Sequence, residues 1–232
     1  METKLIKSWR WFGEKDPVQL EWLKQMGVEE VVTALHQIPN GEVWTIEEIK
    51  KVQIKIKNAG LGWSVVESLP VTEAIKTASP LREKHINNYK TSLLNLAESG
   101  IKTVVYNFMP VLDWARTNLH FRLENGGESM LFDYPTFAAF DIFILKRPGA
   151  AADYSPEMVA KSEAVFHSMT EKEAETLAHN IIVVTQGFID GVIDPTIADY
   201  KRAFLDHLDR YKNIGRDELR ANLAFYLHEV IT

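Results

Sequence analysis

The sequence predicts an α/β fold organised around a parallel β-sheet. Its first half contains four short, largely apolar runs, at 5–12, 28–35, 61–69 and at the start of the stretch 101–117. Helical patterns separate these runs, and such alternation favours parallel pairing through right-handed crossovers. Polar or aromatic residues follow each run, as expected where the carboxyl ends of parallel strands face a ligand.

The composition limits the class of protein. With 232 residues, 46% of them hydrophobic, the chain can bury a substantial core in one domain or two small ones. A net charge of −6, with both signs spread along the chain, indicates neither a nucleic-acid stripe nor a membrane patch. No apolar run approaches the ~20 residues of a membrane span, and the start has no signal-peptide core. We therefore expect a soluble, cytoplasmic protein with no nucleic-acid or membrane partner.

The absence of cysteine excludes a disulfide framework, thiolate metal ligands and a cysteine nucleophile. Four histidines in the second half of the chain predict no metal site. His167, His179, His207 and His228 lie in helical patterns without the His-x-x-x-His spacing of a helical metal site. We interpret them as surface or helix-packing residues, and His85 as a surface residue.

Capping residues mark the helices between the strands. Asp16, followed by proline, predicts a helix start with Asp16 as its N-cap, and Gly27 ends that helix. Thr45 and Glu48 have the spacing of a capping box before the next helix. A longer helix is expected at 82–99, before the fourth strand.

Beyond Thr117 the alternation of strand and helix stops. The Asn-Gly-Gly sequence at 125–127, between two short apolar runs, predicts a small hairpin. The run 137–145 could be helix or strand, and a linker is expected at 192–195. We expect a mostly helical insertion at about 119–194, packed over or beside the strand ends and outside the sheet. Helices are expected at 157–169, 171–184, 197–211 and 217–230.

Several segments resemble mannonate dehydratases, which dehydrate D-mannonate to 2-keto-3-deoxy-D-gluconate. They are VTALHQIPNGEVW at 32–44, GWSVVESLPV at 62–71, NFMPVLDWART at 107–117 and AFDIFILKRPGA at 139–150. The resemblance runs from Arg10 to the last residues and covers only the amino-terminal part of that family's chain. It implies a (β/α)8 TIM barrel of the xylose-isomerase type. This chain would be incomplete, holding about the first four strand–helix units plus the insertion.

The resemblance and the strand ends together give the candidate substrate-binding residues. Arg10 is the candidate for the carboxylate of the sugar acid, because guanidinium pairs well with carboxylates. His36, Glu67, Asn107 and Trp114 would hold or screen the hydroxyls. Each follows, or lies close to, the carboxyl end of a predicted strand.

Each candidate also has a structural interpretation. Arg10 lies between two tryptophans and could form a cation–π pair at the rim. A lone histidine such as His36 is often a hydrogen-bonded structural residue. Glu67 lies in an apolar strand and must be paired, so it could be a charge inside the barrel that Arg10 holds. Asp113 and Arg116 are expected to fix their own loop.

The resemblance also implies a divalent cation, Mn²⁺ or Fe²⁺, and a homo-oligomer. In the family, the metal ligands (two His, a Cys and an Asp) and the proposed catalytic His and Tyr lie in segments that would follow Thr232. We therefore expect the catalytic residues and the metal ligands beyond Thr232, and none of them in this chain. The chain could be a truncated product, part of a longer gene product, or a natural remnant.

We expect residues 1–232 alone to be inactive and poorly stable, because four strands of an eight-stranded barrel leave open edges. For the parent protein, the expected function is D-mannonate dehydration in hexuronate catabolism. The alternatives are a metal-dependent sugar isomerase or epimerase on the same barrel, and a non-catalytic chain that binds a sugar acid.

Overall fold

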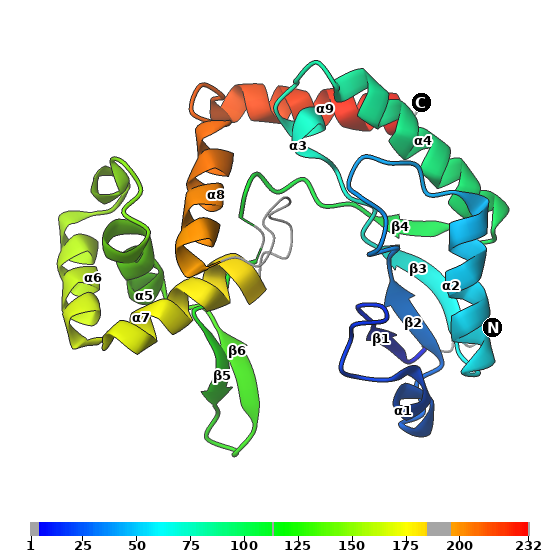
Figure 1. The fold of residues 1–232 in the computed structure, drawn as a ribbon, viewed down its shortest axis with the longest axis horizontal. Helices are drawn as coiled ribbons and strands as arrows, with labels where there is room; N and C mark the ends of the chain where they lie inside the picture. Colours follow the sequence, from blue (N-terminus) through cyan, green and yellow to red (C-terminus); the bar gives the residue numbers. More distant parts are fainter. Residues whose placement is uncertain (1–4, 113, 185–195, 232) are drawn as a thin grey trace. The chain divides into compact units, whose positions relative to one another are not determined.

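The computed structural model (Figure 1) describes residues 5–112, 114–184 and 196–231. They divide into two compact units. Unit 1 combines residues up to Phe108 with those from Ile214 onwards, and unit 2 comprises Met109–Asn213. Unit 1 is therefore assembled from two pieces of chain that are far apart in the sequence. Among the described residues, no helix has both the length and the apolar character needed to cross a membrane.

Unit 1 is an α/β structure built on a parallel sheet with the strand order β1-β2-β3-β4. Arg10 lies opposite Val32 in the register, and Glu67 lies opposite Val105. The predicted parallel sheet is confirmed. In chain order, the elements of unit 1 are β1 (Ser8–Arg10), α1 (Leu20–Gln25), β2 (Glu30–Thr33), α2 (Ile46–Asn58), β3 (Gly62–Glu67), α3 (Glu73–Lys76), α4 (Arg82–Glu98), β4 (Thr103–Val105) and α9 (Arg216–Ile231).

The strands are shorter than the apolar runs predicted. The first run begins at Leu5, but Leu5 and Ile6 are exposed and the ladder starts at Ser8. Pairing continues one residue beyond β1, because the Trp11 amide donates to the Val32 carbonyl at 3.0 Å. Apolar character therefore extended past the residues that pair.

The helix α1 does not begin at Asp16 as the sequence suggested. The Asp16 carboxylate accepts hydrogen bonds from the amides of Phe12 (2.7 Å) and Val18 (2.8 Å). A short polar side chain that bonds nearby amides closes a turn. The helix itself starts at Leu20, and the side chain of its N-cap residue, Gln19, makes no capping bond. Asp16 therefore shapes the loop after β1.

One face of the sheet is covered by helices, and Figure 1 shows α2 running alongside the strands of unit 1. Along β2, Val31 and Thr33 are fully buried, whereas Glu30 and Val32 are partly exposed. Side chains alternate between faces along a strand, so the second face is the more open one. The helices contribute fully buried side chains to the core, among them Leu23, Ile49, Ile56 and Leu96.

Unit 2 contains a separate antiparallel hairpin and a helical cluster. The predicted hairpin is confirmed, and Gly126, with φ +84°, lies in its turn. The ambiguous run at 137–145 is helical, because α5 continues into a π-helical turn. The elements are β5 (Asn118–Arg122), β6 (Glu128–Leu131), α5 (Tyr134–Ala139), η1 (Phe140–Ile144), η2 (Ala150–Asp153), α6 (Pro156–Ser168), α7 (Glu171–Ala178), η3 (His179–Val184) and α8 (Ile197–Asp209).

Unit 2 extends beyond the expected bounds of 119–194. Helix α8 belongs to it because Phe204, which is almost fully buried, packs with Phe140 and Ile181 in the second core. Among the described residues, the strands β5 and β6 pair only with each other. The linker expected at 192–195 lies outside the described residues.

Candidate functional site

Three predicted residues meet at the carboxyl end of the sheet in unit 1. Arg10 is the last residue of β1, Glu67 is the last residue of β3, and His36 follows β2. The Arg10 Nε atom lies 3.8 Å from Oε2 of Glu67. A Cβ placed on Gly13, just after β1, would lie 3.2 Å from Cδ2 of His36, so this loop packs against the imidazole.

The Arg10 guanidinium is fixed by the backbone around it. Its Nη1 atom donates to the carbonyls of Trp11 (3.1 Å) and Val32 (3.3 Å). Burial lowers the pKa of Arg10, while the charges of Glu67 and Asp16 raise it. An arginine keeps its charge under such shifts. Among the described residues, Nη2 makes no hydrogen bond, so Arg10 has a charged donor left for a ligand.

The aromatic partner of Arg10 differs from the one expected. Its guanidinium carbon lies 4.7 Å from the ring centre of Phe12. Trp11 is only 4% exposed and lies on the helix side of the sheet, and Trp9 is 43% exposed. Neighbouring residues of a strand point to opposite faces, which is why Phe12, two positions on, meets Arg10.

The surroundings of His36 favour its neutral imidazole near pH 7. Its surroundings lower its pKa, first through burial of the ring and then through the positive charge of Arg10. A hydrogen bond with the backbone of Trp11 and the charge of Asp16 act in the opposite direction. The ring centres of Phe12 and His36 are 6.2 Å apart. The backbone bond supports the structural interpretation of His36, and its neutral imidazole can still meet a hydroxyl.

Asn107 joins this end of the sheet through Ser68. The Asn107 Nδ2 atom donates to the Ser68 Oγ atom at 3.2 Å. Ser68 directly follows Glu67, and the peptide bond between them is cis. Ser68 was not among the residues predicted from the sequence, although its position at the end of the third strand was a usable signal. Arg10, His36, Glu67 and Asn107 thus belong to one end of one sheet.

Trp114 belongs to unit 2 and is described with that unit only. It is 49% exposed, and the Arg116 guanidinium lies 4.5 Å from its ring centre. Arg116 also donates through Nη1 to the carbonyls of Trp114 (3.2 Å) and Ala115 (2.8 Å), so it fixes its own loop as expected. Asp113 lies outside the described residues.

His85 is not the surface residue that we expected. Its Nδ1 atom is hydrogen-bonded to the Thr72 Oγ1 atom at 2.8 Å. Gly41, with φ +88°, lies so close that an added Cβ would come within 2.8 Å of His85 Cε1. His85 therefore links the loops that follow β2 and β3. The Asn-Gly pair at 40–41 was the only sequence signal for this close approach.

A model of the D-mannonate dehydratase (UxuA) family matches residues 5–232. The chain belongs to this family. It is 44% identical over 224 residues to the mannonate dehydratase of Marinomonas sp., covering 97% of this chain and 56% of that protein. It is 40% identical over 225 residues to that of Saccharophagus degradans, covering 97% of this chain and 55% of that protein.

A solved structure of the D-mannonate dehydratase family is also similar. The crystal structure of mannonate dehydratase from Streptococcus suis serotype 2 aligns with a TM-score of 0.63 and 29% identity. The alignment covers 99% of this chain and 50% of the other. The chain thus spans little more than half the length of the curated relatives that it matches.

The described residues do not fit a divalent-metal centre. No group of three or more histidine, aspartate and glutamate side chains among them could hold a metal ion. At the sheet end, His36 and Glu67 are the described His, Asp or Glu candidates of this site, and Glu67 already faces Arg10. We assign no metal-dependent step to these residues.

The expected position of the family's catalytic residues and metal ligands, beyond Thr232, stays a prediction. The described residues end at Ile231, and Thr232 itself lies outside them. The matched part of the relatives is little more than half of their length, so their remaining segments have no counterpart in residues 1–232. The candidate site described here therefore contains candidate binding residues and no assigned catalytic residue.

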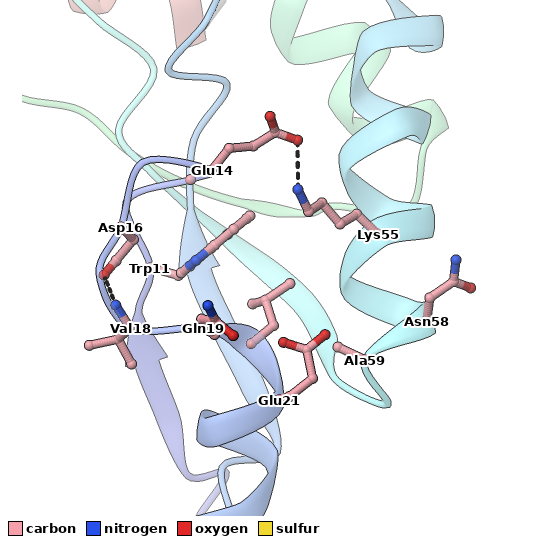
Figure 2. Close-up of a pocket in the computed structure, with 11 residues that line it drawn as sticks. Trp11, Glu14, Asp16, Val18, Gln19, Glu21, Lys55, Asn58 and Ala59 are labelled. Atoms are coloured by element: carbon pink, nitrogen blue, oxygen red, sulfur yellow. Dashed lines mark hydrogen bonds and ion pairs between the residues drawn. The ribbon is translucent and has the colours of Figure 1, made fainter.

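A separate cavity of about 380 Å³ lies between the loop after β1 and helix α2 (Figure 2). Lys55 and Glu14 form an ion pair of 2.6 Å beside it, and the buried Trp11 also lines it. Arg10, Glu67 and Asn107 are not among its lining residues. This cavity and the candidate site are therefore distinct.

Proposed function

We propose that the protein to which these residues belong converts D-mannonate into 2-keto-3-deoxy-D-gluconate and water. The observation that carries the proposal is the convergence of Arg10, His36, Glu67 and Asn107 at one end of a sheet in a chain of this family. The relatives from Marinomonas sp. and Saccharophagus degradans are both named mannonate dehydratases. A sugar acid needs one carboxylate partner and several hydroxyl partners, and these four side chains supply both kinds.

We also propose that unit 1 forms about the first four strand–helix units of a (β/α)8 barrel of the xylose-isomerase type. The four strands are parallel and lie in sequence order, as the first strands of such a barrel do. Unit 2 would be an insertion between β4 and α9, because the chain leaves unit 1 after Phe108 and returns at Ile214. The outer edges of β1 and β4 have no strand partner among the described residues, so further strands could pair there.

In this proposal, Arg10 binds the substrate carboxylate. Its Nη2 atom provides the donor, while Nη1 is held by two backbone carbonyls that keep the guanidinium plane in place. Glu67 is an exposed acidic neighbour at 3.8 Å, too far for a strong hydrogen bond, and it can turn to accept from a substrate hydroxyl. The positive charge of Arg10 can thus pair with the carboxylate of Glu67 and with that of the substrate.

The neutral amide and imidazole orient the rest of the substrate. Asn107 both donates and accepts, and its bond to Ser68 fixes which way the amide faces. The lowered pKa of His36 keeps the imidazole uncharged, so it offers one donor and one acceptor to a hydroxyl. Trp114, whose half-exposed ring belongs to unit 2, stays a predicted substrate-binding residue on the family resemblance alone.

The reaction removes the C2 proton, next to the carboxylate, and releases the C3 hydroxyl as water. The enol that results becomes the 2-keto product. In the family, a bound Mn²⁺ or Fe²⁺ would stabilise the negative charge that develops near the carboxylate. The residues described here bind and orient the substrate, and we assign the proton transfers to none of them.

The same proposal places the protein in the cytoplasm, in hexuronate catabolism, as a homo-oligomer. A small water-soluble sugar acid as substrate suits that compartment. Exposed apolar side chains, among them Trp22, Ile54 and Leu94, could be covered in such an assembly. Sedimentation of the purified protein measures the oligomeric state directly.

The deciding experiment incubates the protein, in its full natural chain, with D-mannonate and Mn²⁺ or Fe²⁺. We expect 2-keto-3-deoxy-D-gluconate to accumulate, and chelation to stop its formation. Conversion to an isomer with no loss of water would instead indicate an isomerase or epimerase. Binding of D-mannonate without turnover in either metal would indicate a non-catalytic sugar-acid-binding protein, and the proposal would be wrong.

A further inference from the structure

An aromatic side chain from the last helix lies directly behind the end of β4. Tyr226, on α9, is 1% exposed. Its ring centre is 5.9 Å from that of Tyr106 and 6.2 Å from that of Phe108. The ring of Tyr89, on α4, meets it edge-on at 5.4 Å and 88°. One buried ring thus contacts both residues that flank Asn107.

The Tyr226 hydroxyl adds one polar contact with α4 to these ring contacts. It is hydrogen-bonded to the hydroxyl of Tyr89, and burial raises the pKa of both groups, so the pair stays neutral. Aromatic pairs with well-defined geometry stabilise a structure beyond what their buried area alone contributes. The side chains on both sides of Asn107 therefore contact one ring, and that ring also contacts Tyr89 on α4.

We propose that Tyr226 is a positioning residue: its ring contacts on either side of Asn107 direct the Asn107 amide toward Ser68 and the carboxyl end of the sheet. The binding role of Asn107 rests on the proposed function, whereas the contact between Tyr226 and the residues around Asn107 does not. The consequence is that substrate affinity at the sheet end depends on a side chain from α9, which does not itself reach the substrate.

Helix α9 has other contacts with the rest of unit 1. Asn222 Nδ2 donates to the Lys76 carbonyl at 2.9 Å, and Lys90 pairs with Glu229 at 2.9 Å. A substitution at Tyr226 should therefore leave the helix docked. Phe225 is the matched control, because this neighbouring aromatic packs under Arg82 at 3.7 Å and has no ring contact with Tyr106 or Phe108.

The first measurement does not depend on activity. Amide hydrogen exchange, followed by mass spectrometry, is compared in the full protein for wild type, Tyr226→Leu, Tyr226→Phe and Phe225→Leu. We expect peptides that span 103–110 to exchange at least about ten times faster in Tyr226→Leu, with β1 to β3 unchanged. Tyr226→Phe keeps the ring and should stay close to wild type, as should Phe225→Leu. Unchanged exchange at 103–110 in Tyr226→Leu would overturn the proposal.

The second measurement separates positioning from a general structural role. We expect Asn107→Ala and Tyr226→Leu each to raise the KM for D-mannonate about ten-fold, with kcat reduced much less. The double variant should be no worse than either single variant, because both remove the same contact. Effects that multiply would show that Tyr226 acts independently of Asn107, and the proposal would fail.

The two measurements distinguish the possible failures. If exchange at 103–110 rises but Asn107→Ala leaves KM unchanged, Tyr226 positions the segment and the binding role proposed for Asn107 is wrong. If Tyr226→Leu does not fold, the same measurements are made on Tyr106→Leu. Tyr106 is 42% exposed, so this change removes one ring contact and spares the core. In Tyr106→Leu, we expect faster exchange at 103–110 and a higher KM. If exchange or KM stayed at the wild-type value, the proposal would be overturned.

Discussion

Arg10 and Glu67 form an ion pair that spans three strands of the sheet. The two residues end β1 and β3, with β2 between them, and Nε and Oε2 are 3.8 Å apart. About half of the Glu67 side chain is exposed, so water screens this attraction and the pair contributes little to stability. A pair of this kind can rearrange when a charged ligand arrives, which suits a binding site better than a structural core.

The first prediction concerns Arg10. Arg10→Lys keeps the positive charge but loses the planar fork that pairs with a carboxylate, so we expect the KM for D-mannonate to rise at least about ten-fold. Steady-state kinetics measures this effect. Glu14→Gln is the control, since it breaks the ion pair with Lys55 beside the separate cavity and should leave KM unchanged. An unaltered KM in Arg10→Lys would remove Arg10 from the substrate site.

The second prediction concerns Gly41. Gly41→Ala combines a left-handed backbone with a Cβ that would lie 2.8 Å from His85, whereas Gly27→Ala has a similar φ of +81° and open space around it. Backbone strain should cost each variant about 1–3 kcal/mol, with a further loss for Gly41→Ala from the contact with His85. Urea unfolding measures both. Adding His85→Ala should recover that further loss, and equal losses in the two glycine variants would contradict the prediction.

The third prediction concerns pH. His36 and His85 both have pKa values below the ordinary 6.5, mainly through burial. The unfolded chain therefore binds more protons than the folded one just below pH 6.5, and stability should fall as the pH drops from about 6.5 toward the lowered pKa values. The free energy of unfolding, measured between pH 5 and 8, gives the slope of stability against pH. His36→Gln should flatten it, and an unchanged slope would show that His36 does not titrate differently on folding.

The fourth prediction concerns unit 2. The buried Asp141 carboxylate accepts two bonds from Arg147, at 2.9 and 2.7 Å, and one from the Tyr154 hydroxyl at 2.9 Å. Arg147→Met would leave that carboxylate buried without its counter-charge, at a cost of about 3–5 kcal/mol. Tyr154→Phe removes one hydrogen bond and should cost only about 1–3 kcal/mol. Thermal unfolding compares the two, and the opposite order would be evidence against this account.

The parallel sheet could be predicted from the sequence because strand and helix alternate and each strand ends in polar residues. The same rule brought Arg10, His36 and Glu67 to one end, since the carboxyl ends of parallel strands lie together. Their functional roles remain proposals. The family could be recognised from short segments such as those around His36 and Asn107.

Other features depend on packing that a linear pattern does not contain. Asp16 followed by proline has the local signature of an N-cap, but its carboxylate bonds the Phe12 amide instead. Helix α8 joins unit 2 through a buried Phe204 whose partners lie far back in the sequence. His85 has no unusual neighbours in sequence, and only the fold brings Gly41 and Thr72 to it. Contacts between distant segments decided each of these cases.

The division of unit 1 into two sequence segments bears on how the nascent chain matures on the ribosome. Roughly a hundred residues of unit 2 are translated between Phe108 and Ile214, a delay on the order of 5–20 seconds at ~5–20 residues per second. During that interval Tyr89, Tyr106 and Phe108 have emerged without the α9 ring that covers them. A chaperone that binds exposed aromatics would therefore meet this segment early and release it once α9 arrives.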